Sequence, residues 1–212
     1  MKLCKFALPS LLMLGTASLM LGNQIGVTVG GPFGADENNA SWMLGYSFTA
    51  NSAIQVIGLG IYDDNGSNGL NSAHDVGLWD SQGNLLASAT VPAGTAGTLI
   101  TNFMFASISP LQLTAGQTYT VGAEVTVAQG DNWVADPTNF DVAPDITYLS
   151  REYDTYSGTL IDPTFAGSNS VGYFGGNIEF ASAVPEPSSI APLALVLLAL
   201  GYAWRRRAAA IA

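Results

Sequence analysis

Short runs of β-favouring residues, separated by turn residues, follow one another through most of this chain. The clearest run spans residues 118–127, where apolar residues from Tyr119 to Val127 occupy every second position. A period of two places one face of a strand against a core and the other face toward solvent. No helical periodicity interrupts the pattern between Asn39 and Ala183. The sequence therefore predicts an all-β domain.

Seven segments share this composition: residues 42–49, 53–62, 74–79, 85–91, 99–106, 118–127 and 171–180. Clusters of glycine, asparagine, serine and proline separate several of them, as expected for turns. Many short strands without helices predict an antiparallel two-sheet β-sandwich over residues 40–183, with a jelly-roll-like strand order. An immunoglobulin-like order is the alternative. Residues 23–39, rich in glycine, asparagine and threonine, are predicted to form a flexible lead-in.

The two ends of the chain have the composition of targeting segments. Residues 1–22 begin with two lysines and continue with an apolar stretch, as in a secretory signal peptide. An uncleaved anchor is the alternative. Residues 190–204 carry no charge and predict a transmembrane helix about 22 Å long, short against a hydrocarbon core of about 30 Å. The alternative, a buried helix of the domain, leaves the basic residues that follow unexplained.

Arg205, Arg206 and Arg207 follow the apolar segment directly, within a basic tail of residues 205–212. Positive charge next to a membrane segment marks its cytoplasmic side, so the tail is expected in the cytoplasm. The β-rich domain before the helix is then expected outside the cytoplasmic membrane.

Pro185, Glu186 and Pro187, within residues 184–189, precede the apolar segment, and the two prolines keep this tripeptide extended. The tripeptide, the short apolar helix and the arginine cluster together resemble the PEP-CTERM sorting signal of exported bacterial proteins. The same tail is also labelled an ice-binding protein C-terminal domain, which describes the tail alone.

The resemblance implies export through the secretion machinery and recognition by a membrane-embedded exosortase. It also implies anchoring in the membrane through the helix before processing. Final delivery would be to the cell surface or an extracellular polysaccharide matrix, in a Gram-negative-type bacterium.

A second resemblance covers residues 42–127. Its motifs are residues 57–63 (IGLGIYD), 74–80 (HDVGLWD) and 113–119 (LTAGQTY). These motifs resemble a β-sandwich domain of unknown function found in secreted bacterial proteins. The resemblance implies a sandwich fold, and it brings no established reaction and no catalytic residues.

Charge is distributed very unevenly along the chain. Arg151 is the only basic residue between Asn23 and Val184, where fifteen acidic residues give a formal charge of −14. Such a field repels nucleic acid and anionic lipid, so no nucleic-acid partner is expected. The single cysteine, Cys4, lies in the predicted signal peptide, so the exported domain has no disulfide and no cysteine nucleophile.

Residues 63–69 (DDNGSNG) form a candidate Ca²⁺ site. Asp63, Asn65 and Ser67 offer side-chain oxygens at alternating positions, and Asp64 and Asp75 are further candidate ligands. Ca²⁺ takes six to eight oxygen ligands, and a strongly acidic domain favours a bound divalent cation. The alternative is a simple turn between strands, where aspartate, asparagine and glycine are common in any case.

Trp133, Tyr148, Tyr153 and Tyr156 lie within residues 131–162, a polar segment predicted to be a long loop. Aromatic side chains beside carboxylates are typical of sugar-binding surfaces, so these four are the candidate glycan contacts. Trp133 is predicted to be exposed.

The sequence indicates no catalytic residues. His74, the only histidine, is predicted to be a structural residue at a strand start, and no Gly-x-Ser-x-Gly motif is present. Three functions therefore remain, with a non-catalytic structural or adhesive exported protein first. A carbohydrate-binding module for extracellular polysaccharide is second, and a secreted hydrolase with paired carboxylates is third.

Overall fold

The computed structural model describes residues 22–30, 35–64, 66–166 and 172–182 of the 212-residue chain. The predicted signal peptide, sorting tripeptide, transmembrane helix and basic tail lie outside these ranges, as does Asn65. Within these ranges, no helix has the length and apolar composition needed to cross a membrane. The described core belongs to one compact unit, Leu21–Ala183.

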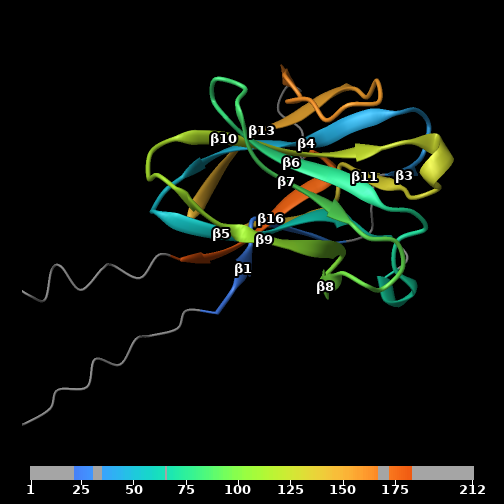
Figure 1. Ribbon diagram of the computed structural model, residues 1–212, viewed down its shortest axis with the longest axis horizontal. Helices are drawn as coiled ribbons and strands as arrows, with labels where there is room; N and C mark the ends of the chain where they lie inside the picture. Colours follow the sequence, from blue (N-terminus) through green and yellow to red (C-terminus); the bar gives the residue numbers. More distant parts are fainter. Residues whose placement is uncertain (1–21, 31–34, 65, 167–171, 183–212) are drawn as a thin grey trace, which may run out of the picture. The chain divides into compact units, whose positions relative to one another are not determined.

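Two large antiparallel sheets lie face to face (Figure 1). The five-stranded sheet has the order β1 (Gln24–Ile25), β16 (Gly176–Ser182), β5 (Ile54–Tyr62), β9 (Phe103–Leu113) and β8 (Thr98–Ile100). The six-stranded sheet has the order β14 (Phe165–Ala166), β13 (Ile146–Thr155), β4 (Trp42–Ala50), β10 (Thr118–Val125), β6 (His74–Asp80) and β7 (Leu85–Val91). The predicted all-β antiparallel sandwich is confirmed.

Smaller elements complete the domain. A three-stranded sheet contains β15 (Tyr173–Phe174), β11 (Trp133–Ala135) and β3 (Ala35–Glu37), and a two-stranded sheet pairs β12 (Asn139–Val142) with β2 (Val27–Gly30). Two short 3₁₀ turns, η1 (Gly66–Asn68) and η2 (Val127–Gln129), follow β5 and β10.

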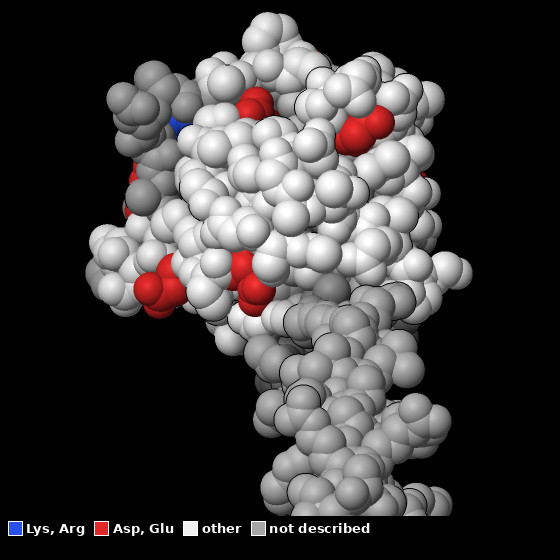
Figure 2. Space-filling view, turned by 90° about the vertical axis from the view of Figure 1, so that its left-hand side faces the viewer, with Lys and Arg blue, Asp and Glu red and all other residues white. Residues whose placement is uncertain are grey.

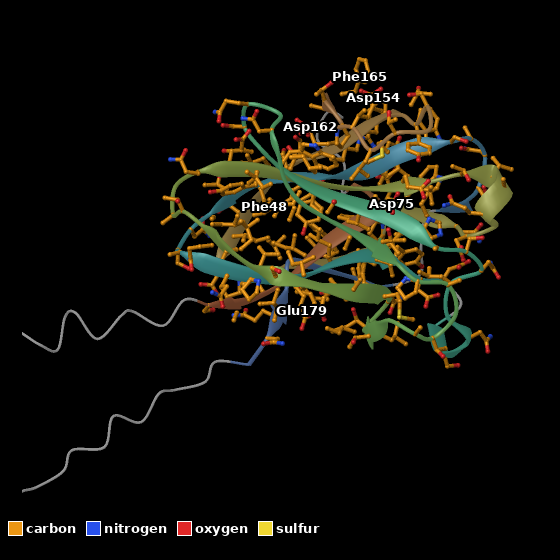
Figure 3. All side chains as sticks on the ribbon, in the orientation of Figure 1. Phe48, Asp75, Asp154, Asp162, Phe165 and Glu179 are labelled. Atoms are coloured by element: carbon orange, nitrogen blue, oxygen red, sulfur yellow. The ribbon has the colours of Figure 1, made fainter. Side chains whose placement is uncertain are left out.

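The core lies between the two large sheets, and strand alternation explains which residues enter it. On β4, Leu44, Tyr46 and Phe48 occupy alternate positions and are almost completely buried. Figure 3 shows Phe48 between the sheets. Burying a large apolar side chain contributes about 1.5–3 kcal/mol, so this periodic set fixes the register of β4 strongly.

A row of glycines crosses the middle of the six-stranded sheet, where Gly45 of β4 pairs with Gly122 of β10 and Gly122 pairs with Gly77 of β6. A Cβ atom on Gly176 of β16 would lie 2.8 Å from the Gly122 carbonyl carbon, so the two sheets approach closely here. On the other side, a Cβ atom on Gly122 would lie 3.0 Å from Pro163. Glycine therefore lets chain segments pack against both sides of β10.

Strand β13 contains a break in its register with β4. Tyr148 pairs with Phe48 and Ser150 pairs with Ser47, so Leu149 has no partner on β4. This is the geometry of a β-bulge, in which one strand holds an extra residue. Beyond it, Tyr153 pairs with Leu44.

A buried ion pair ties β6 to the segment before β11. His74 is fully buried, and its Nε2 lies 2.9 Å from Oδ2 of Asp131, while its Nδ1 lies 2.9 Å from the carbonyl oxygen of Glu124. Asp131 also accepts hydrogen bonds from the backbone N–H groups of Asn71 (2.7 Å) and Ser72 (3.0 Å). These contacts agree with the structural role predicted for His74.

Three sequence predictions about secondary structure were wrong in detail. The single strand predicted at residues 99–106 is two strands, β8 and β9, because Thr101 has a left-handed φ of 52° and turns the chain. Residues 131–162 contain β11, β12 and β13 instead of one long loop, and residues 23–39 contain β1, β2 and β3 instead of a flexible lead-in. Five of these six strands have only two to four residues, too few for an alternating pattern to stand out, and the bulge at Leu149 interrupts the alternation of the sixth, β13.

Candidate functional site

An aromatic pocket with a volume of about 240 Å³ lies where β4 and β13 meet the three-stranded sheet. Its lining residues are Asn39, Trp42, Leu44, Trp133, Tyr153 and Tyr173. The alternation of β4 that buries Tyr46 and Phe48 also directs Trp42 and Leu44 to the same side of the sheet. The opposite wall is formed by β11 and β15 of the small sheet.

Each ring in the pocket stands nearly perpendicular to the next. Trp42 and Tyr153 have ring centroids 6.3 Å apart at 81°, and Tyr153 and Tyr173 have centroids 6.1 Å apart at 83°. Trp133 and Tyr173 are 5.2 Å apart at 80°. Edge-to-face contacts at these distances stabilise aromatic clusters, so the side chains hold one another in place.

A second hollow, of about 260 Å³, adjoins the pocket through Trp42 and Tyr153. Asp154, Thr155 and Phe165 complete its lining. Phe165 is 58% exposed, and its ring lies 5.8 Å from that of Tyr153. Figure 3 shows Asp154 and Phe165 near each other where β13 pairs with β14. We refer to the pocket and this hollow together as the aromatic site.

Arg151, the only lysine or arginine between Asn23 and Val184, lies beside this site. The guanidinium carbon of Arg151 lies 4.2 Å from the centroid of the Tyr173 ring, a cation–π contact. Within the described part of the chain, Arg151 forms no ion pair with any carboxylate. On the face drawn in Figure 2, acidic side chains lie apart from one another around a broad uncharged area. Because the formal charge between Asn23 and Val184 is −14, the domain that holds the aromatic site has a negative net field.

The structure brings together only part of the predicted glycan-contact set. Trp133 and Tyr153 both line the aromatic pocket, but the expectation that Trp133 is exposed was wrong, because it is 5% exposed within β11. Tyr148 lies elsewhere: its ring packs against Tyr46 and Phe140, and burial raises its pKa to about 12. Tyr156 is partly buried outside both hollows.

Sequence reasoning missed three aromatic members of the site, namely Trp42, Tyr173 and Phe165. Trp42 continues the apolar alternation of β4, a pattern that by itself predicts packing in the core. Tyr173 and Phe165 belong to strands of two residues, too short for a periodic signal.

Three carboxylates of the predicted Ca²⁺ site accept separate hydrogen bonds within the protein. Asp63 is buried and its Oδ1 accepts from Gly66 N–H (3.1 Å), and Asp64 accepts from Asn132 Nδ2 (2.7 Å). Asp75 accepts from Thr90 on β7. In the described ranges, no group of three or more acidic, histidine or cysteine side chains is placed to hold a metal ion. The Ca²⁺ site stays a prediction.

Two carboxylates interact on the outer side of the six-stranded sheet. Glu152 is 8% exposed and accepts hydrogen bonds from the hydroxyl groups of Ser47 (2.7 Å) and Ser150. Asp162 is half-buried, and its Oδ1 has no hydrogen-bond partner among the described residues. Burial, followed by the negative charges of Glu152 and Asp80, raises the pKa of Asp162 to about 6.

The Asp162→Asn variant is expected to unfold about 2–4 °C higher than the wild type at pH 8, which corresponds to about 1 kcal/mol after solvent screening. The pKa of Asp162 is about 6 in the folded protein, above its unfolded value of 3.8. The fold therefore favours the neutral carboxyl at low pH, and ionisation of Asp162 removes this stabilisation as pH rises through about 6. Calorimetry at pH 4 and pH 8 measures the difference. Equal gains at both pH values would contradict the charge explanation. The Asp141→Asn variant, at an exposed site, is the control.

Comparison with known families gives two matches. Residues 30–167, more than half of the chain, match the family model described as Domain of unknown function (DUF4082). Residues 183–207 match the PEP-CTERM protein-sorting motif. This motif indicates an exported protein that an exosortase sorts, at the cell surface or outside the cell. The first match covers most of the aromatic site, with Tyr173 just beyond it.

No curated protein matches the sequence. The solved structure of the infectious bursal disease virus VP2 subviral particle aligns with 97% of this chain at 13% identity and a TM-score of 0.26, and the alignment spans 54% of that viral chain.

Proposed function

The chain belongs to the DUF4082 family and carries a PEP-CTERM sorting motif, and on that premise we propose that its exported domain binds an extracellular polysaccharide through the aromatic site. The observation that carries this proposal is the group of five aromatic rings lining two adjoining hollows of the β-sandwich domain. In this proposal the domain is a binding protein and not an enzyme.

The chemistry of the aromatic site suits a sugar. Aromatic rings offer large apolar faces to the C–H groups of a pyranose, and small-molecule sites combine such walls with a few polar groups. Asn39, Asp154 and Thr155 supply the polar groups here. Because the domain carries a formal charge of −14 between Asn23 and Val184, a neutral glycan is the preferred ligand over an acidic one.

The Trp42→Ala and Tyr153→Ala variants are each expected to weaken glycan binding by about tenfold, since each ring borders both hollows and losing one aromatic contact costs on the order of 1.4 kcal/mol. A glycan array identifies the ligand, and titration calorimetry measures the affinities. The Tyr156→Ala variant, outside both hollows, is the matched control and should bind as the wild type does. Absence of binding on the array, or equal losses in all three variants, would refute the proposal.

The same samples also test whether the domain hydrolyses the glycan. Glu152 is buried and engaged by two serine hydroxyl groups, which supports a structural role for this carboxylate. Product analysis after incubation with the bound glycan is expected to find the glycan intact. Cleaved products would favour the paired-carboxylate hydrolase instead.

A structural or adhesive role is the second candidate function. One feature favours it: β7 is a long edge strand without charged residues. A protein of the cell surface or matrix could assemble through such an edge, whether or not the aromatic site binds a glycan.

A further inference from the structure

The edges of the two large sheets differ in how they are protected from pairing with another strand. Exposed edges carry unpaired N–H and C=O groups, and proteins usually protect them with short strands, charges, prolines or bulges. In the five-stranded sheet, β1 has two residues and β8 has three. Strand β9 continues past β8, but Pro110 removes one backbone donor there.

The two edge regions of the six-stranded sheet differ most in this protection. On one side, β13 extends past the two-residue β14, but it holds the bulge at Leu149 and the charged residues Arg151, Glu152 and Asp154. On the other side, β7 runs for seven residues and pairs only with β6. Its single irregularity lies at the Leu85 end, so the stretch from Ala87 to Val91 is regular. Among the described strands, β7 is thus the long edge without charge or proline, and its one bulge is confined to the Leu85 end.

No acidic or basic residue occurs between Asp80 and Glu124, a stretch that contains all of β7, β8 and β9. The two leucines at the start of β7, Leu85 and Leu86, are 49% and 37% exposed. A groove of about 550 Å³ separates β7 from β9 and is lined mainly by alanine, serine and threonine side chains. This edge is therefore uncharged and is bordered by small side chains.

We propose that β7 pairs antiparallel with β7 of a second copy of this chain, around a two-fold axis at Ser88. The distribution of charge favours a second copy of this chain as the partner. Two domains of formal charge −14 repel each other at most approaches, whereas this edge brings no charge of its own to the contact. Near the axis β7 is also compatible with itself, because Ser88 faces Ser88 and Ala87 faces Ala89 across such a pair.

The nearest charge that contacts β7 is that of Asp75, which accepts a hydrogen bond from Thr90 (Figure 3 labels Asp75). In a pair centred on Ser88, Thr90 of one copy lies opposite Leu86 of the other. The two Asp75 carboxylates then lie at opposite ends of the interface. The pairing would present two aromatic sites on one particle and would increase the avidity for a repeating polymer.

Sedimentation velocity tests the proposal on the compact unit Leu21–Ala183, and crosslinking tests it on the full chain. The wild type is expected to form dimers whose dissociation constant falls as NaCl rises from 0.05 to 0.5 M, because salt screens the repulsion between two acidic domains. The Ser88→Glu variant places like charges opposite each other across the two-fold axis and should dimerise about tenfold more weakly. The Ser88→Lys variant should behave in the same way for the same reason.

Mixing the two Ser88 variants gives the sharpest result, since Glu and Lys then face each other and heterodimers should form at least as tightly as the wild type. The Ser157→Glu variant has the same charge change at an exposed loop position and should dimerise as the wild type does. A wild type that stays monomeric at 0.5 mM in 0.5 M NaCl overturns the proposal. So does a dimer that Ser88 variants leave unchanged. Glycan binding by monomers would be unaffected in either case, so this proposal and the proposed function can fail separately.

Discussion

The Asp131→Ala variant is expected to lower the free energy of unfolding by about 3–5 kcal/mol, because it removes one partner of a buried ion pair. His74 would remain fully buried without its carboxylate, and the N–H groups of Asn71 and Ser72 would lose their acceptor. Each buried polar group left without a partner costs about 1–3 kcal/mol. Urea unfolding of the Leu21–Ala183 unit at pH 7 measures the loss.

The pH dependence of the same variant separates the ion pair from simple packing. Burial opposes the ionised form of Asp131, but the hydrogen bonds from His74, Asn71 and Ser72 outweigh it and lower the pKa of this carboxyl below its usual value of 3.8. Its contribution to stability is therefore complete above about pH 4 and is lost as pH falls through the lowered folded-state pKa.

The difference between wild type and Asp131→Ala should accordingly shrink in strong acid. The Asp141→Ala variant makes the same charge change at an exposed position and should alter stability by less than about 0.5 kcal/mol. A loss in Asp131→Ala that is the same at pH 2 and pH 7 would mean that the ionised carboxylate contributes nothing.

The Gly45→Ala variant is expected to lose more than about 3 kcal/mol, or to fail to fold. A Cβ atom at this position would lie 1.7 Å from the carbonyl oxygen of Val121 on the neighbouring strand β10. Overpacking usually costs about 1–3 kcal/mol when side chains can move aside, but here the obstacle is the backbone of a central strand. Relief would require separating β4 from β10 in the middle of the six-stranded sheet.

The Gly94→Ala variant is the matched control for this prediction. Gly94 has a φ of +68° and no atom within 4 Å of an added Cβ, so the substitution adds backbone strain of about 1–2 kcal/mol without a collision. Chemical denaturation should therefore rank Gly45→Ala well below Gly94→Ala in stability. The opposite order would mean that β4 and β10 can move apart at little cost.

Sequence periodicity predicted the sandwich because its central strands have one face in the core throughout. Residues 85–91 coincide with β7, and residues 118–127 contain β10, although β10 ends at Val125 and Val127 begins a 3₁₀ turn. The same reasoning failed where a strand has only two to four residues, too few for the alternation to be recognised. Turn composition predicted bends correctly, but it could not distinguish a loop from a segment that contains short strands.

The aromatic site was only partly predictable, because its walls come from separate sheets. Nothing in the alternation of β4 shows that the wall opposite Trp42 is formed by Trp133 and Tyr173 and encloses a hollow. Trp133 was correctly grouped with Tyr153 on composition, but its burial depends on pairing within the small three-stranded sheet.

The bulge at Leu149 decides which tyrosines can share a side of β13. Tyr148 and Tyr153 are five positions apart, so a regular strand would direct them to opposite faces, yet both pack with inward-facing rings. The extra residue at Leu149 shifts the alternation by one position, so that both tyrosine side chains lie on the same side of β13. Strand length is consequently as important to this protein as side-chain identity. In related chains, an insertion or deletion near position 149 should disrupt the aromatic pocket more than replacement of any single lining residue. Chains that keep the spacing between Tyr148 and Tyr153 are expected to keep the pocket.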